Sequence, residues 1–269
     1  MNSDAHGSTR APVTVLSIAG SDSGGGAGIQ ADLKAFARCG VHGATAITAI
    51  TAQNTVGVSA IAPVAPEMIL AQVRAVAEDL RIDAVKIGML GDLATIEAVI
   101  EALATVDVPV VLDPVMVAES GAILLAEAAR AALRERLVPL ATVVTPNVPE
   151  ARVLSGATTD VDQLELAKAV HRLGARIAVV TGGHLECAED LFFDGERATT
   201  ISGPRHPDGA AHGSGCTHAS VLAAQLALGR SPLEAARTAR VLAGEAVRDG
   251  LRGLGAGAGP VDVLAALRQ

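Results

Sequence analysis

The sequence has no tryptophan and no tyrosine, and only three of its 269 residues are phenylalanine. Aromatic side chains form the stacking platforms of most single-strand nucleic-acid binders, so their scarcity argues against that class of function. Any flat ring bound by this chain must instead be covered by aliphatic side chains, methionine and backbone. The net charge of -8 also argues against binding to nucleic acid or to anionic membranes, both of which need basic surface.

Cysteine is scarce, and signals for export or membrane insertion are missing. The three cysteines (Cys39, Cys187 and Cys216) are widely spaced, which is typical neither of a disulfide framework nor of a zinc site and suits a reducing compartment. The first residues are polar and lack the apolar run of a signal peptide. The uncharged stretch 39–66 still contains Gln, Asn, Thr, Gly and Pro, so we expect buried soluble structure there. We therefore expect a cytoplasmic protein.

Short β-branched runs alternate along the chain with longer runs rich in alanine and leucine. We expect strands at 13–20, 44–51, 59–64, 83–89, 108–113, 141–146 and 175–183, and a hairpin at 190–201. We expect helices at 28–40, 66–80, 92–104, 124–136, 214–228, 231–248 and 260–268, and helical segments from 147 to about 173. This alternation predicts an α/β fold with a central, mostly parallel β-sheet and helices on both faces. Residues 1–12 are expected to form a disordered tail before a single domain spanning 13–269. In such a sheet, ligands bind beyond the carboxyl ends of the strands.

Glycines crowd the turn after the first expected strand, where residues 26–31 read GAGIQA. This fits a loose dinucleotide-binding pattern, but the window about 20 residues further on contains no acid to bind a ribose. Close packing alone would also explain the glycines. Asp22 and Asp32 bracket the turn, and Asp32 equally suits a solvated acid in the first turn of a helix. The chain has no Gly-Lys dipeptide, which excludes a Walker A loop.

Polar residues follow several other expected strands. Gln53 and Asn54 are amides in an uncharged stretch, where they either bond to nearby backbone or recognise the edge of a polar heterocycle. Asp113 and Glu150 would together hold a hydrated Mg²⁺ that also binds substrate phosphates, although Glu150 equally suits a helix N-terminal acid. The glycines of the TGGH segment at 181–184 would let the backbone approach a phosphate.

The segment 212–218 reads HGSGCTH and opens a helix rich in alanine. Small residues before a helix leave free N–H groups that, together with the helix dipole, favour an anion. On residue type alone, Cys216 suits a buried structural role as well as a chemical one. Its place at the start of the helix is expected to lower the pKa of its thiol.

Taken together, these segments resemble one family. AGSDSGGGAGIQADLKAF, TAITAQNTVGV, RIDAVKIGMLGD, VVLDPVMVAESGAILL, TPNVPEA, TGGH and HGSGCTHAS have the order and spacing of the hydroxymethylpyrimidine/phosphomethylpyrimidine kinases of thiamine synthesis, from about residue 13 to 230. These enzymes belong to the ribokinase-like superfamily. The resemblance implies one α/β domain, MgATP as phosphoryl donor and a homodimer. It also implies 4-amino-5-hydroxymethyl-2-methylpyrimidine, its monophosphate, or both in succession as acceptor.

The resemblance also assigns roles to residues of this chain. The pyrimidine would lie among Ala27, Asp32, Gln53, Met89 and Val115. Mg²⁺ would bind near Asp113 and Glu150. The nucleotide would contact Asn147, Thr181, Gly183 and Thr217. The catalytic anion hole would comprise Gly213, Ser214, Gly215 and Cys216. Cys216 takes the position where much of the superfamily carries an aspartate base.

The sequence departs from the family pattern at two places. Thr181 stands where the family usually has a lysine, which removes a cation from the phosphates unless an arginine substitutes. The tail reads GAGAGPVDV, where the family often has a Gly-His-Gly element before GPV. Two other functions stay open: a pyridoxal or pyridoxine kinase, since related folds with GxGC loops serve that substrate, and a non-catalytic sensor that binds the pyrimidine.

Overall fold

A central sheet of eight strands organises the protein, seen in a computed structural model that describes residues 11–157, 161–183 and 189–268. The strands lie in the order β10-β9-β8-β7-β6-β5-β1-β2. Their bounds are β1 Thr14–Ala19, β2 His42–Ile47, β5 Ala84–Ile87, β6 Val110–Leu112, β7 Val143–Val144, β8 Ile177–Val180, β9 Asp190–Phe193 and β10 Ala198–Ile201. The strands from β2 to β8 are parallel, and β9 and β10 pair antiparallel at one edge. Of the expected tail, residues 1–10 lie outside the described residues.

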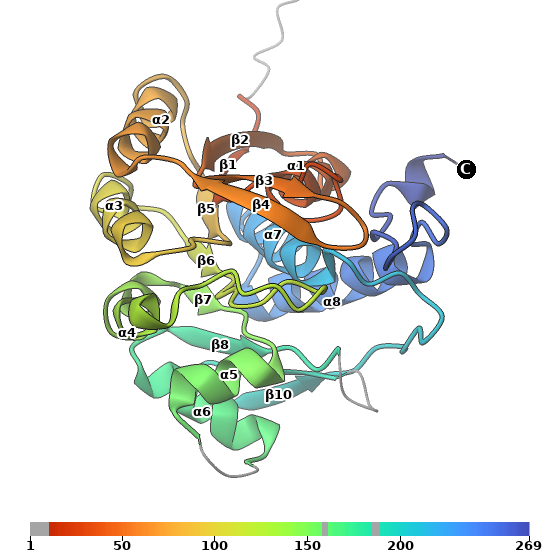
Figure 1. The fold of residues 1–269 in the computed structure, drawn as a ribbon. Helices are drawn as coiled ribbons and strands as arrows, with labels where there is room; N and C mark the ends of the chain where they lie inside the picture. Colours follow the sequence, from red (N-terminus) through yellow and green to blue (C-terminus); the bar gives the residue numbers. More distant parts are fainter. Residues whose placement is uncertain (1–10, 158–160, 184–188, 269) are drawn as a thin grey trace, which may run out of the picture.

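Helices cover both faces of the sheet, as the sequence predicted (Figure 1). One face carries α1 (Gly28–Arg38), α7 (Ser214–Ala227) and α8 (Pro232–Arg248). The other carries α2 (Pro66–Asp79), α3 (Leu93–Leu103), the short α4 (Arg130–Ala132), α5 (Val148–Ser155) and α6 (Gln163–Arg172). Among the described residues, no helix combines the length and the hydrophobicity that crossing a bilayer requires.

The two-residue period of the strands divides their side chains between two cores. On β1, Leu16 and Ile18 join the core under α2 and α3, whereas Val15 joins the core under α1 and α7. On β5, Val85 and Ile87 face the α2 side in the same way. The alternation therefore turns Lys86 toward α1 and α7, where it is fully buried.

The strand predicted at 44–51 is divided into two at Thr48. The Thr48 N–H donates to the Ala19 carbonyl and its hydroxyl donates to the Met89 carbonyl, so the chain leaves the sheet there. The next residues form β3 (Ala49–Gln53), which pairs with β4 (Val58–Pro63) in a separate antiparallel hairpin. Figure 1 shows this hairpin lying across the strand ends near α7. The hairpin thus carries Gln53 away from the main sheet.

Two helix predictions were wrong. In the predicted helix 124–136, 3-10 turns at Glu127–Ala129 and Val138–Leu140 flank α4 and the π-turn Leu133–Leu137, so no regular helix forms. At 260–268 only a 3-10 turn, Ala265–Leu267, is present. The residues just before that turn form no helix, and Val261 and Val263 pack against Ala246 of α8. The hairpin predicted at 190–201 is confirmed as β9 and β10.

Candidate functional site

A cavity of about 360 Å³ opens at the carboxyl ends of the parallel strands. Ala19, Met89, Asp113, Thr145 and Thr181 line it, and each ends or follows a different strand of the sheet. Most of the residues singled out in the sequence line it too: Ala27, Gln53, Met89, Asp113, Val115, Asn147, Glu150, Thr181, Gly183, Gly213, Ser214, Gly215 and Cys216. Asp32 and Thr217 are not among the lining residues, and both are fully buried.

The glycine-rich turn after β1 is built around Asp22. The carboxylate of Asp22 accepts hydrogen bonds from the N–H groups of Gly24, Gly26 and Ala27 at 2.8 to 3.0 Å, and His212 Nε2 lies 2.9 Å from it. Burial raises the pKa of Asp22, but these hydrogen bonds outweigh it and hold the pKa below its usual value. These N–H groups are therefore already bonded to the carboxylate of Asp22 and are not available to a ligand. This argues further against the binding of a dinucleotide phosphate at the turn.

The start of α7 packs directly against this turn. Gly213 is the N-cap of α7 and has a φ of 86°, a left-handed conformation that favours glycine. A Cβ at Gly213 would overlap the carbonyl oxygen of Gly26, so the close approach also requires glycine. Within the described residues no side chain caps this helix, and Ser214, Gly215 and Cys216 of its first turn line the cavity. The N-terminus of α7 is thus available to an anion in the cavity.

Cys216 corrects one prediction from the sequence. Although part of its surface is accessible, burial in protein raises the pKa of its thiol to about 12. Lys86 opposes this effect, and the carboxylates of Asp113 and Asp32 add to it. The helix start was expected to lower this pKa, but desolvation and two nearby negative charges prevail. Cys216 is therefore a neutral thiol at physiological pH.

Asp32 lies below the cavity and not in its lining. Its carboxylate is bound by Lys86 Nζ at 2.8 Å, by the Ser17 hydroxyl at 2.6 Å and by the Ser220 hydroxyl at 2.7 Å. The predicted contact between Asp32 and the acceptor is replaced by this network, because the side chain points from α1 toward β1, β5 and α7. Burial lowers the pKa of Lys86, but the charge of Asp32 outweighs it and keeps the pKa above its usual range.

Lys86 itself was missed in the sequence. It lines the floor of the cavity, near enough to Asp113 and Cys216 to affect the pKa of each. Lysine is rarely buried, so a lysine inside a short apolar strand is unusual. This feature of the sequence would have identified Lys86.

Two carboxylates follow β6 and β7. Oδ2 of Asp113 is buried and has no hydrogen-bond partner among the described residues. Glu150 is the N3 residue of a capping box on α5, in which it accepts from the N–H of Asn147 at 3.0 Å and also accepts from Met116 at 3.3 Å. Burial is the largest effect that raises the pKa of each acid, and Asp113 further raises that of Glu150. Two buried acids this close favour a positive charge between them.

The two amides after β3 have different roles. Asn54 Oδ1 accepts from the N–H groups of Val56 and Gly57, so it shapes the hairpin turn. Gln53 lines the cavity, as do Met89, Val115 and Leu124. The described lining includes none of the three phenylalanines. A small ring would therefore lie against thioether and methyl groups with one amide at its edge.

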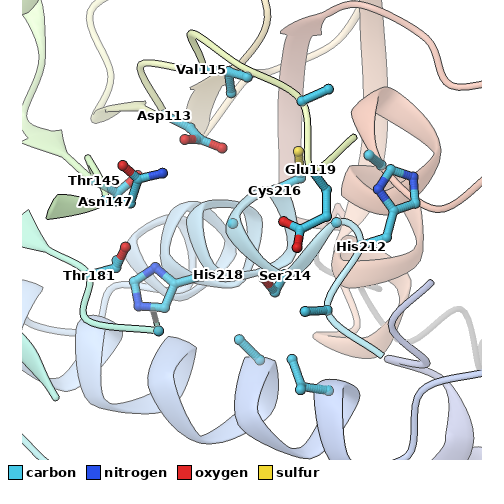
Figure 2. Close-up of a pocket in the computed structure, with 18 of the residues that line it drawn as sticks. Asp113, Val115, Glu119, Thr145, Asn147, Thr181, His212, Ser214, Cys216 and His218 are labelled. Carbon is cyan, nitrogen blue, oxygen red and sulfur yellow. The ribbon is translucent and has the colours of Figure 1, made fainter. Parts of the chain in front are cut away.

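The opposite half of the cavity has a polar wall. Figure 2 shows Asn147, Thr181 and His218 projecting into it from one side, and an isolated bridge pairs Asn147 with Thr181. His218 of α7 and Arg240 of α8 line this half and were not predicted from the sequence. Among the described residues no group of three or more His, Cys, Asp and Glu side chains gathers as a metal site.

Comparisons with known proteins identify what this arrangement resembles. The profile of a family described as phosphomethylpyrimidine kinase matches residues 22–262. The hydroxymethylpyrimidine/phosphomethylpyrimidine kinase of Rhizobium meliloti (strain 1021) is 48% identical over 91% of this chain and 95% of its own. An ADP complex of Bacillus subtilis pyridoxal kinase has a TM-score of 0.88 at 36% identity, covering 96% of this chain and 100% of that one. A phosphomethylpyrimidine kinase of Clostridium difficile 630 has a TM-score of 0.76 at 37% identity, over 85% and 96%.

Proposed function

Since the chain belongs to the phosphomethylpyrimidine kinase family, we propose that it phosphorylates 4-amino-5-hydroxymethyl-2-methylpyrimidine, its monophosphate, or both, in thiamine biosynthesis, with ATP as donor. One observation carries this assignment: the uncapped N-terminus of α7 faces the same cavity as an apolar slot with a single amide. The first suits a phosphoryl group, and the second suits an aminopyrimidine. A phosphotransferase needs both in reach of each other.

The acceptor ring occupies the slot next to the glycine-rich turn. Met89 and Val115 cover its faces, Ala27 contacts its edge, and Gln53 exchanges hydrogen bonds with its polar atoms. The hydroxymethyl group then points toward Cys216 and Gly215. Asp32 acts only through Lys86 on the floor of the cavity, because the network with Ser17 and Ser220 occupies its carboxylate.

Phosphoryl transfer depends mainly on positioning and charge stabilisation. The hydroxymethyl oxygen attacks the γ-phosphorus in line, and the bond from that phosphorus to ADP breaks. The N–H groups of Ser214, Gly215 and Cys216 stabilise the charge on the transferring group. The neutral thiol of Cys216 orients the hydroxyl, and the hydroxyl proton passes late to an oxygen of the transferred group.

The site also suits Mg²⁺, held by Asp113 and Glu150. Oδ2 of Asp113 lacks a partner among the described residues, and burial raises the pKa of both acids, so a cation beside them would be favoured. Two carboxylates are what Mg²⁺ takes from protein when phosphates and waters supply the other ligands. The ion would neutralise phosphate charge. Asn147, Thr181 and Gly183 complete the nucleotide side.

We propose residues 13–269 as one catalytic domain of a cytoplasmic homodimer. The outer face of the β3–β4 hairpin supports the dimer. Ile50 pairs with Ala62 and Ala52 pairs with Ala60, and all four side chains are exposed. An exposed apolar sheet face of this kind is typical of an interface, and a second copy of the chain would bury it.

A coupled assay of ADP release tests the function with four reactions: the pyrimidine, its phosphate, pyridoxal, and no acceptor. We expect either pyrimidine to raise the rate well above that without acceptor, with a phosphorylated product identified by mass spectrometry. Stimulation by pyridoxal alone would instead assign the chain as a pyridoxal or pyridoxine kinase. The likeness to Bacillus subtilis pyridoxal kinase favours this second candidate function. An unchanged rate with every acceptor would contradict the proposal.

A further inference from the structure

His218 is a buried histidine in the wall of the cavity. It lies in the second turn of α7, is 5% exposed, and takes no part in the proposed transfer step. Its Nε2 lies 3.1 Å from Oδ2 of Asp190, the first residue of β9, which is 2% exposed. Oδ1 of Asp190 accepts from the Gly182 N–H at 3.1 Å. Asp190 thus holds the histidine against the turn that follows Thr181.

The imidazole is not saturated by these neighbours. Within the described residues, neither Nδ1 nor Nε2 of His218 makes a well-aligned hydrogen bond, and neither does Oδ2 of Asp190. Buried polar atoms are nearly always paired in folded proteins. A buried ring that faces a cavity with a free nitrogen therefore points to a ligand that supplies the missing partner.

Three of the other cationic side chains that line the cavity have partners within the protein, whereas the exposed Arg205 and the partly exposed His206 line it as well. Lys86 is bound to Asp32, and His212 is bound to Asp22. Arg240 donates to the carbonyl oxygen of Pro204. Figure 2 shows His218 beside Thr181 and Asn147, on the wall where these two neutral side chains supply no charge.

We propose that His218, held by Asp190, donates a hydrogen bond from Nδ1 to the phosphate chain of the bound nucleotide. The inference rests on the proposed phosphoryl transfer. A ring that donates from Nε2 to Asp190 and from Nδ1 to phosphate is an imidazolium, because neutral imidazole has only one N–H. The charged groups near the ring are Asp190 of β9 and Asp113 after β6. Lys86 of β5, Arg240 of α8 and Arg205 line the same cavity, and Asp32 of α1 is bound to Lys86.

Nucleotide affinity therefore has a pH dependence that belongs to this residue. Histidine ordinarily loses its charge between pH 5 and 8. We expect ADP to bind more weakly as the pH rises from about 6 to about 8.5, and His218→Gln to remove most of that change. At the lower pH the variant should bind ADP about tenfold more weakly, the loss of one charge-assisted hydrogen bond. Affinity for the pyrimidine should stay within about twofold.

The measurement is calorimetric titration of ADP in EDTA, so that neither turnover nor metal affects the result. His42→Gln, at an exposed position on β2, is the matched control and should keep the wild-type profile. Thr181→Lys in the His218→Gln background should restore affinity without restoring the pH dependence. Asp190→Asn offers a second route if His218→Gln fails to fold, and should move the loss of affinity to lower pH.

Two outcomes separate this inference from the function. If the wild type binds ADP with the expected pH profile but phosphorylates no pyrimidine, the function fails and the role of His218 stands. If the enzyme is active while His218→Gln binds ADP with the wild-type affinity at every pH, the role of His218 is refuted alone.

Discussion

At the scale of single residues, Cys216 shows how position and environment compete. A helix start stabilises a thiolate, but burial and two carboxylates raise the pKa of this thiol to about 12. The residue is thus suited to orienting a hydroxyl group and unsuited to acting as a base at neutral pH. Loose phosphoryl transfer needs little help from a base, so the chemistry tolerates a neutral group there.

Alkylation by iodoacetamide tests this protonation state. In a Cys39→Ala/Cys187→Ala variant, we expect the rate at Cys216 to rise about tenfold per pH unit from about pH 7 to about pH 10, because only the thiolate reacts. Mass spectrometry follows the product. The same variant in denaturant is the control and should level off near the ordinary thiol pKa of about 8.5. A plateau of the folded protein below about pH 9 would show that the helix dipole prevails.

Residue type and spacing predicted most of the cavity, and the exceptions share a physical cause. Strand ends converge at one edge of a parallel sheet, so Asp113, Glu150 and the segment that begins at Thr181 were identified from their place in the chain, whereas Asn147 was named through the family resemblance. Asp32 was identified too, but its pairing with Lys86 was not, because the two residues are 54 residues apart and the contact depends on which face of β5 meets α1. His218 depends in the same way on Asp190, a contact between α7 and β9.

At the scale of elements, the Lys86–Asp32 pair joins β5 to α1, and hydroxyl groups from β1 and α7 complete it. Both side chains are fully buried. A buried ion pair adds little net stability compared with apolar packing, but removal of one partner leaves a charge uncompensated. The pair therefore fixes how the helices of this face sit on the sheet, directly below the reacting groups.

A double-mutant cycle measures this coupling. We expect Lys86→Met to lower the free energy of unfolding by about 3–5 kcal/mol, since Asp32 is then a buried unpaired charge. Asp32→Asn in the same chain should recover much of the loss. Urea unfolding of the ligand-free protein gives the values. Lys168→Met, which breaks an exposed pair with Glu165, is the control and should cost less than about 1 kcal/mol. A loss of that small size for Lys86→Met would mean that Asp32 needs no partner.

The element boundaries that the sequence did not predict also have local causes. The continuous β-branched run 44–51 gave no sign of the break at Thr48, because the break depends on carbonyl groups of Ala19 and Met89 from other strands. At 260–268 the buried residues are the consecutive run from Pro260 to Val263, whereas Ala265 is only partly buried and Ala266 is exposed. Short segments of this kind take their conformation from the surface they pack against, here α8.

At the scale of the whole molecule, the two sides of the β3–β4 hairpin face different surroundings. Its inner side carries Gln53 to the cavity, and its outer side exposes the apolar row Ile50, Ala52, Ala60 and Ala62. If two chains pair through this row, an element that contacts the acceptor is held between two protomers. Dimerisation and acceptor binding would then support each other.

A charge in the outer row tests the dimer. We expect Ile50→Glu to change the mass measured by light scattering from that of two chains to that of one chain, 27.0 kDa. The reason is that Glu would be desolvated against a second copy of the same face. Val241→Glu, at an equally exposed apolar position on α8, is the control and should stay dimeric. A wild-type protein that is monomeric at every concentration would exclude the assembly.

The cavity walls described above contain methionine, valine and leucine in place of aromatic rings, and the chain has neither tryptophan nor tyrosine. The protein is consequently almost transparent in the near ultraviolet. A pyrimidine or adenine ring that enters the cavity is then the dominant chromophore of the complex. Occupancy of this site can be recorded as a difference spectrum of the ligand itself, without a label and with almost no background from the polypeptide.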